Sequence, residues 1–93
     1  MRPLDPLLTS PLRLGIVSLL IKLKSASFVF LKEELKASQG NLSVQLDKLN
    51  QAGYITIAKS FSKNYPKTTC TISDKGIKAF EDHVKALKEY LHL

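Results

Sequence analysis

The sequence predicts an α+β fold, mainly α-helical with a small β-hairpin, in a single domain over residues 1–93. Three observations support this prediction. Apolar residues recur at helical spacing in several segments, two β-branched segments lie close together in the chain, and 93 residues is the size of one domain. Hydrophobic residues make up 44% of the chain and charged residues 24%, as in globular proteins, which argues against disorder.

The first predicted helix covers residues 10–24. Ser10 suits the N-cap and Pro11 the first helical position. Two apolar stripes run along this helix, one at Leu12, Ile16, Leu19, Leu20 and Leu23 and the other at Leu14, Val17 and Ile21. A helix that is apolar on nearly every side needs cover on nearly every side, and a chain this short offers little. We therefore expect a second copy of the chain to cover part of it.

A helix-turn-helix is predicted over residues 30–53. Residues 28–30 are expected as one short strand at its start, and residues 31–36 as its first, short helix. The small and polar residues 37–40 form the turn, from which Ser38 caps the next helix. That helix buries Leu42, Leu46 and Leu49, and Gly53 suits the left-handed position after its end.

A β-hairpin and a final helix complete the chain. Residues 54–73 are predicted as the hairpin, with strands at 54–58 and 67–72 and a long tip at 60–66. Residues 74–92 form the last helix, capped by Ser73 or Asp74. Its apolar residues alternate at steps of three and four, the spacing of paired helices, which predicts a C-terminal dimerisation helix. The predicted dimer interface comprises Leu14, Val17, Ile21, Phe80, Val84, Leu87 and Leu91.

Two short helices joined by a turn and followed directly by a basic hairpin form the winged helix-turn-helix arrangement, a three-helix core plus a wing. The turn sets the third helix so that its polar face projects, and such a helix fits the major groove of DNA, about 12 Å wide. Lys59, Lys63 and Lys67 recur around the hairpin, with no acidic residue between Gly53 and Ser73. The net charge of +6 also favours a polyanionic partner. The sequence therefore predicts binding to double-stranded DNA.

Three segments carry a resemblance to a known family: residues 4–20 (LDPLLTSPLRLGIVSLL), 30–55 (FLKEELKASQGNLSVQLDKLNQAGYI) and 59–80 (KSFSKNYPKTTCTISDKGIKAF). On these segments the sequence resembles the small winged-helix transcriptional regulators of the MarR/ArsR-like kind. The resemblance implies a homodimer joined through the first and last helices, a pseudo-palindromic operator, a third helix in the major groove and a wing on the flanking backbone. The DNA-binding residues that it implies are Gln39, Asn41, Ser43, Val44, Gln45, Lys48, Lys63 and Lys67.

The wing departs from this family in one respect. Wings of the family often carry arginine, whereas this hairpin carries lysines and the pair Asn64-Tyr65. Lysine lacks the planar fork that favours a narrow minor groove. We therefore expect Lys63 and Lys67 to contact phosphates rather than to insert into the minor groove of DNA.

No catalytic activity, metal or cofactor is expected. The sequence shows no nucleophile with a suitable base, no clustered carboxylates and no glycine loop for phosphate. His83 and His92 are the only histidines, and the single Cys70 excludes an intramolecular disulfide. A redox switch at Cys70 and a protein-interaction module without specific DNA binding are the alternatives. Nothing in the sequence identifies a small-molecule effector.

The sequence predicts a soluble, cytoplasmic protein without a membrane partner. An acid and two prolines stand among the first six residues, where a secretory signal would have an apolar run. The most apolar run, residues 12–23, contains Arg13 and Lys22. It is also shorter than the roughly 20 residues that span a bilayer.

Overall fold

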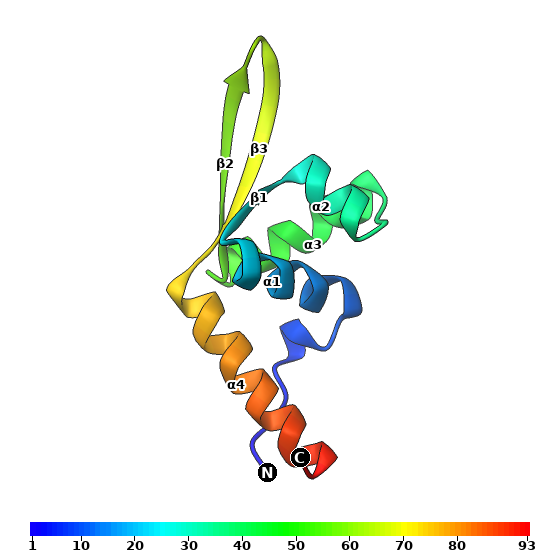
Figure 1. Ribbon diagram of the computed structural model, residues 1–93, viewed down its shortest axis with the longest axis vertical. Coiled ribbons are helices and arrows are strands. Elements are labelled where there is room, and N and C mark those ends of the chain that lie inside the picture. Colours follow the sequence, from blue (N-terminus) through cyan, green and yellow to red (C-terminus); the bar gives the residue numbers. More distant parts are fainter.

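The protein is an elongated α+β molecule of 51 × 24 × 21 Å, seen here in a computed structural model that describes residues 1–93, with the backbone alone at Ser62. Its elements are the 3₁₀ helix η1 (Pro6–Leu8), α1 (Pro11–Leu23), β1 (Ser25–Ser27), α2 (Phe28–Glu34), α3 (Gln39–Gln51), β2 (Ile55–Ser62), β3 (Tyr65–Ile72) and α4 (Asp74–Leu91). The strands form one antiparallel sheet in the order β1-β3-β2. Figure 1 shows the β2–β3 hairpin and α4 extending from opposite ends of a body made by α1, α2 and α3. The predicted fold class is confirmed.

Serine side chains begin the three longest helices, as the sequence predicts. The Oγ atoms of Ser10, Ser38 and Ser73 accept the backbone N–H groups of the residues three positions further on, at 3.3, 3.2 and 3.0 Å. Each bond satisfies one of the N–H groups that a helix leaves free at its N-terminus. Gly53 follows α3 with a φ of 79°, the left-handed conformation expected of it.

The predicted strand at residues 28–30 is wrong. The strand lies at Ser25–Ser27, where Ser25 pairs with Thr71 and Ser27 with Thr69 of β3. Phe28 instead begins α2, because the Ser27 hydroxyl accepts the backbone N–H of Phe30 at 3.1 Å and caps that helix. The cap at Ser27 thus starts a helix at an aromatic and β-branched segment that would otherwise favour a strand.

The predicted long tip of the hairpin is also wrong. The ladder runs without interruption from the pair Ile55–Ile72 to the pair Ser62–Tyr65, and only Lys63 and Asn64 lie between the strands. Both turn residues have positive φ, 52° and 67°. This is the conformation of a two-residue type I′ turn, which matches the twist of the strands that it joins. The wing is therefore a longer and more regular hairpin than its sequence suggests.

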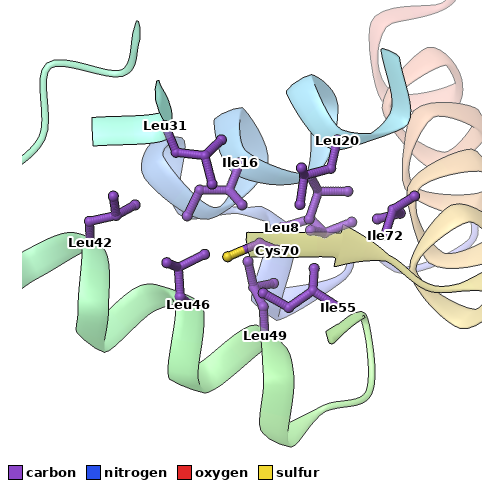
Figure 2. Packing of buried hydrophobic residues seen from close by; sticks show 11 residues of the cluster. Leu8, Ile16, Leu20, Leu31, Leu42, Leu46, Leu49, Ile55, Cys70 and Ile72 are labelled. Carbon is purple, nitrogen blue, oxygen red and sulfur yellow. The ribbon is translucent and has the colours of Figure 1, made fainter. Parts of the chain in front are cut away.

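The core lies between α1, α3 and the base of the sheet (Figure 2). Leu42, Leu46 and Leu49 of α3 are buried against it, as predicted. Val17 of α1 is fully buried in the same core. Its predicted place in a dimer interface is wrong, because a side chain without exposed surface cannot contact a second copy. The chain itself covers this side of α1, which packs against η1, α3, β3 and α4.

None of the helices in the described part of the chain combines the length and the apolar composition that crossing a membrane requires.

Candidate nucleic-acid interface

The third helix, α3, turns its leucines to the core and its polar residues outward. Gln39, Asn41 and Lys48 are exposed, Val44 is 50% exposed, and Ser43 is half-buried. The α3 residues predicted to contact DNA therefore lie on the side of the helix that the core does not use. Most of them stand in the first two turns, the part of a recognition helix that reaches base edges.

A groove of about 310 Å³ joins this helix to the hairpin. Gln39, Ser43 and Asp47 line it from α3, and Lys59 and Thr68 line it from the hairpin. Lys59 and Thr68 are directly paired across β2 and β3, so they present their side chains on the same face of the sheet. The polar face of α3 and the base of the wing thus form one continuous surface.

The wing is basic along its length and also carries aromatic residues. Lys63 in the turn and Lys67 in β3 are exposed. Phe61 is 80% exposed and Tyr65 74% exposed. Since side chains alternate along a strand, Phe61 shares the face of Lys59, which is the face turned to α3. Phe61 was not among the predicted site residues, although a phenylalanine in a polar, basic hairpin stands out in the sequence.

Gln45 is held by neighbouring side chains. Arg13 Nη1 donates to Gln45 Oε1 at 2.5 Å, and Gln45 Nε2 donates to Asn41 Oδ1 at 3.0 Å. Arg13 Nε also donates to the carbonyl oxygen of Leu7, at 2.7 Å. The sequence did not predict a part for Arg13 in this site. Its only signal there was a charged residue in the first turn of an apolar helix. The network ties the body of the protein to the α3 face.

The segment before α1 is hydrogen-bonded to α4 and to Tyr54, which follows the end of α3. Tyr54 Oη donates to Asp5 Oδ2 at 2.6 Å, and the backbone N–H of Asp5 donates to Nδ1 of the buried His83 at 3.1 Å. Partial burial and the hydrogen bond to Asp5 raise the pKa of Tyr54 to about 12. These groups border a cavity of about 610 Å³, into which Lys75 also projects.

An apolar stripe on α4 lies beside the face that α4 uses for its own contacts. Gly76, His83 and Ala86 are buried on the used face. The stripe consists of Ile77, Phe80, Val84, Leu87 and Leu91, all of which are half-buried or exposed. Leu91 is 62% exposed. The predicted interface residues Leu14 and Ile21 of α1 are half-buried and pack against the core.

Cys70 is inaccessible on β3. It is fully buried in the core, and burial raises the pKa of its thiol to about 11. A thiol that stays protonated and hidden is poorly suited to redox chemistry, because the thiolate is the reactive form. Among the described residues, no group of three or more His, Cys, Asp or Glu side chains is placed to hold a metal ion.

A helix-turn-helix whose second helix projects a polar face, followed by an antiparallel hairpin beside that face, defines the winged-helix class. A family model described as a winged helix DNA-binding domain matches residues 12–91, and the chain belongs to that family. The resemblance to winged-helix transcriptional regulators, seen in the sequence, is confirmed.

Similar proteins agree with this assignment. MJ0432, an uncharacterized protein of Methanocaldococcus jannaschii, is 37% identical over 75 residues, which are 81% of this chain and 82% of the relative. The structure of a transcriptional regulator homologue from Pyrococcus horikoshii OT3 has a TM-score of 0.79 at 30% identity, over 94% of this chain and 89% of that one. An ArsR family transcriptional regulator, RHA00566, shares the fold with a TM-score of 0.61 at 17% identity, over 92% of this chain and 84% of that one. Family and fold are those of transcriptional regulators, which are generally not enzymes.

Proposed function

We propose that the protein is a homodimeric transcriptional regulator of the cytoplasm that binds double-stranded DNA in a sequence-specific way. One observation carries the proposal: the polar face of α3 and the acid-free, lysine-bearing hairpin border the same groove. A projecting helix fits the major groove, while a basic hairpin beside it reaches the phosphates of the flanking backbone.

The residues on α3 and the wing have different roles in this proposal. Gln39, Asn41, Ser43, Val44, Gln45 and Lys48 form the surface that enters the major groove. Amides and hydroxyls hydrogen-bond to base edges there, and Val44 suits the methyl group of thymine. Lys63 and Lys67 contact phosphates, which supplies affinity for any sequence.

The apolar stripe on α4 is the proposed dimer interface. Its exposed residues would be costly in water, and two such stripes related by a two-fold axis cover each other. A symmetric dimer places two copies of α3 in successive major grooves about 34 Å apart, so the operator is a pseudo-palindrome. The chain offers no observation that identifies a small-molecule effector.

Fluorescence anisotropy with a labelled random-sequence duplex tests the proposal directly. The titration is made at two salt concentrations, and the same sample is sedimented to obtain the mass of the complex. If a dimer neutralises about six phosphates, log K falls against log salt with a slope near −5. Binding that does not respond to salt would exclude DNA as the partner. A folded dimer that binds no duplex at low salt would instead indicate a protein-interaction module.

A further inference from the structure

Three side chains connect α1 to the first turn of α3 through consecutive hydrogen bonds. Arg13 Nη1 donates to Gln45 Oε1 at 2.5 Å, and Gln45 Nε2 donates to Asn41 Oδ1 at 3.0 Å. Arg13 is itself fixed by the bond from its Nε to the Leu7 carbonyl oxygen, at 2.7 Å. At the far end, the backbone N–H of Asn41 donates to the hydroxyl of the cap residue Ser38, at 3.2 Å.

The chemistry of Arg13 fixes the direction of every bond in this chain. A guanidinium group only donates hydrogen bonds, so Gln45 must turn its oxygen toward Arg13. The amide nitrogen of Gln45 then faces Asn41, and because that nitrogen only donates, Asn41 must turn its own oxygen toward Gln45. The NH₂ group of Asn41 points away from this contact. Asn41 is exposed, so this NH₂ group is available to a ligand.

We propose that the Arg13–Gln45–Asn41 chain makes Asn41 a hydrogen-bond donor in the major groove, where it selects a base with an acceptor and excludes cytosine at one position of each half-site. Guanine N7 and O6, adenine N7 and thymine O4 accept hydrogen bonds in the major groove, whereas cytosine presents only its donating N4 amino group there. An unrestrained asparagine turns either end of its amide to a base, but this one is held in one orientation. Asn41 contacts the base, and Arg13 and Gln45 are positioning residues. This inference rests on the proposed function and extends it to base preference.

The variant Gln45→Glu reverses the chain. A carboxylate at position 45 accepts from Arg13 on one side and from Asn41 on the other, so Asn41 must turn its NH₂ group inward and its oxygen outward. The exposed oxygen then accepts from the amino group of adenine or cytosine. The experiment selects bound duplexes from a random pool and sequences them, for the wild type, Asn41→Ala and Gln45→Glu. Asn41→Ala identifies the position that Asn41 contacts, because only that position loses its preference.

The expected result is that cytosine is disfavoured by about tenfold at that position in the wild type, whereas Gln45→Glu prefers adenine or cytosine, the bases with an amino group. Gln51→Glu is the matched control, because it places the same charge at the exposed end of α3. Its discrimination against cytosine should match that of the wild type. Gln45→Met removes both amide contacts and should abolish the preference without reversing it. Thermal unfolding shows whether each variant is folded. If Gln45→Glu does not fold, the loss of preference in Gln45→Met tests the inference.

Two results would overturn the inference while leaving the proposed function intact. One is discrimination against cytosine that persists in both Gln45 variants, and the other is a preference for cytosine at the Asn41 position of the wild type. A wild-type protein that binds no duplex at low salt would overturn both the proposed function and this inference. The wild-type titration therefore separates the two failures.

Discussion

Gly76, in the first turn of α4, lies directly against the carbonyl oxygen of Tyr54. A Cβ atom at Gly76 would collide with that oxygen and would also lie 2.8 Å from Cδ1 of Ile72. The contact is part of a joint in which the backbone N–H of Ser73 donates to the same Tyr54 oxygen at 3.0 Å. Two backbone segments meet here, so neither can move aside to admit a side chain. The joint sets the direction in which α4 leaves the body of the protein.

The substitution Gly76→Ala should therefore destabilise the fold by about 1–3 kcal/mol, the usual cost of forcing an extra carbon into a packed site. Urea unfolding, monitored by circular dichroism, measures this change in the free energy of unfolding. Gly40→Ala is the matched control, because a Cβ at Gly40 meets nothing within 4 Å. Within a helix, that substitution should stabilise by roughly 0.5–1 kcal/mol. Equal effects of the two substitutions would contradict the packing described at Gly76.

The free energy of unfolding should fall as the pH rises above about 9. Burial favours the neutral thiol of Cys70 and raises its pKa from 9.0 to about 11. In the unfolded chain the thiol ionises first, near its ordinary pKa, so alkali stabilises the unfolded state. The stabilising contribution is complete below pH 9 and disappears as the pH approaches 11. Urea midpoints between pH 8 and pH 11 should decline less steeply in Cys70→Ala than in the wild type.

A thiol reagent tests the same burial at neutral pH. Cys70 in the native protein should react with Ellman's reagent far more slowly than in urea, because the folded core covers it completely. Rapid labelling of the native protein would contradict the burial of Cys70 and would restore a redox switch as a candidate. Tyr54→Phe serves as a control, since it removes a phenol near the surface and should leave the thiol hidden.

Local signals in the sequence were enough to predict the boundaries of α1, α3 and α4 and the face of α3. Ser10 and Ser38 act within their own helices, and the spacing of the α3 leucines reflects a single buried side. Such features depend on neighbouring residues only. They were predicted correctly for that reason.

Features that depend on distant residues were missed. Strand β1 has the sequence Ser-Ala-Ser, which has no strand pattern, and it forms because β3 offers it an unpaired edge. Val17 repeats at helical spacing, but spacing does not tell whether the chain itself or a second copy covers a residue. Arg13 and Gln45 are 32 positions apart, and only the packing of α1 on α3 brings them together.

Removing a charge from the turn of the wing should weaken binding to all DNA sequences alike. Lys63 has a φ of 52°, so Lys63→Asn is the suitable variant, because asparagine tolerates this left-handed conformation. The magnitude of the slope of log K against log salt should fall by about 1 for each phosphate that the variant no longer neutralises. Anisotropy titrations against several duplexes at three salt concentrations measure it.

Lys85→Gln removes the same charge from an exposed position on α4 and should leave the salt slope unchanged. A Lys63→Asn protein with altered base preference but an unaltered slope would place the turn against bases rather than phosphates.

A charge in the middle of the α4 stripe should separate the proposed dimer. Val84 lies at its centre, between Phe80 and Leu87, and in a two-fold arrangement the two copies of Val84→Glu would bring like charges into an apolar interface. Dimer affinity should fall by about a hundredfold or more, because a buried, unpaired carboxylate costs several kcal/mol. Sedimentation across a range of concentrations measures the change.

Val29→Glu is the matched control for this variant. Val29 lies on α2 and is 60% exposed, outside the α4 stripe, so its replacement should leave the dimer intact. Binding to a palindromic duplex should weaken strongly in Val84→Glu, whereas binding to a single half-site should change little, because each α3 face stays complete. A Val84→Glu protein that sediments as a dimer would show that the two copies meet elsewhere, and the spacing of about 34 Å between half-sites would then have no basis.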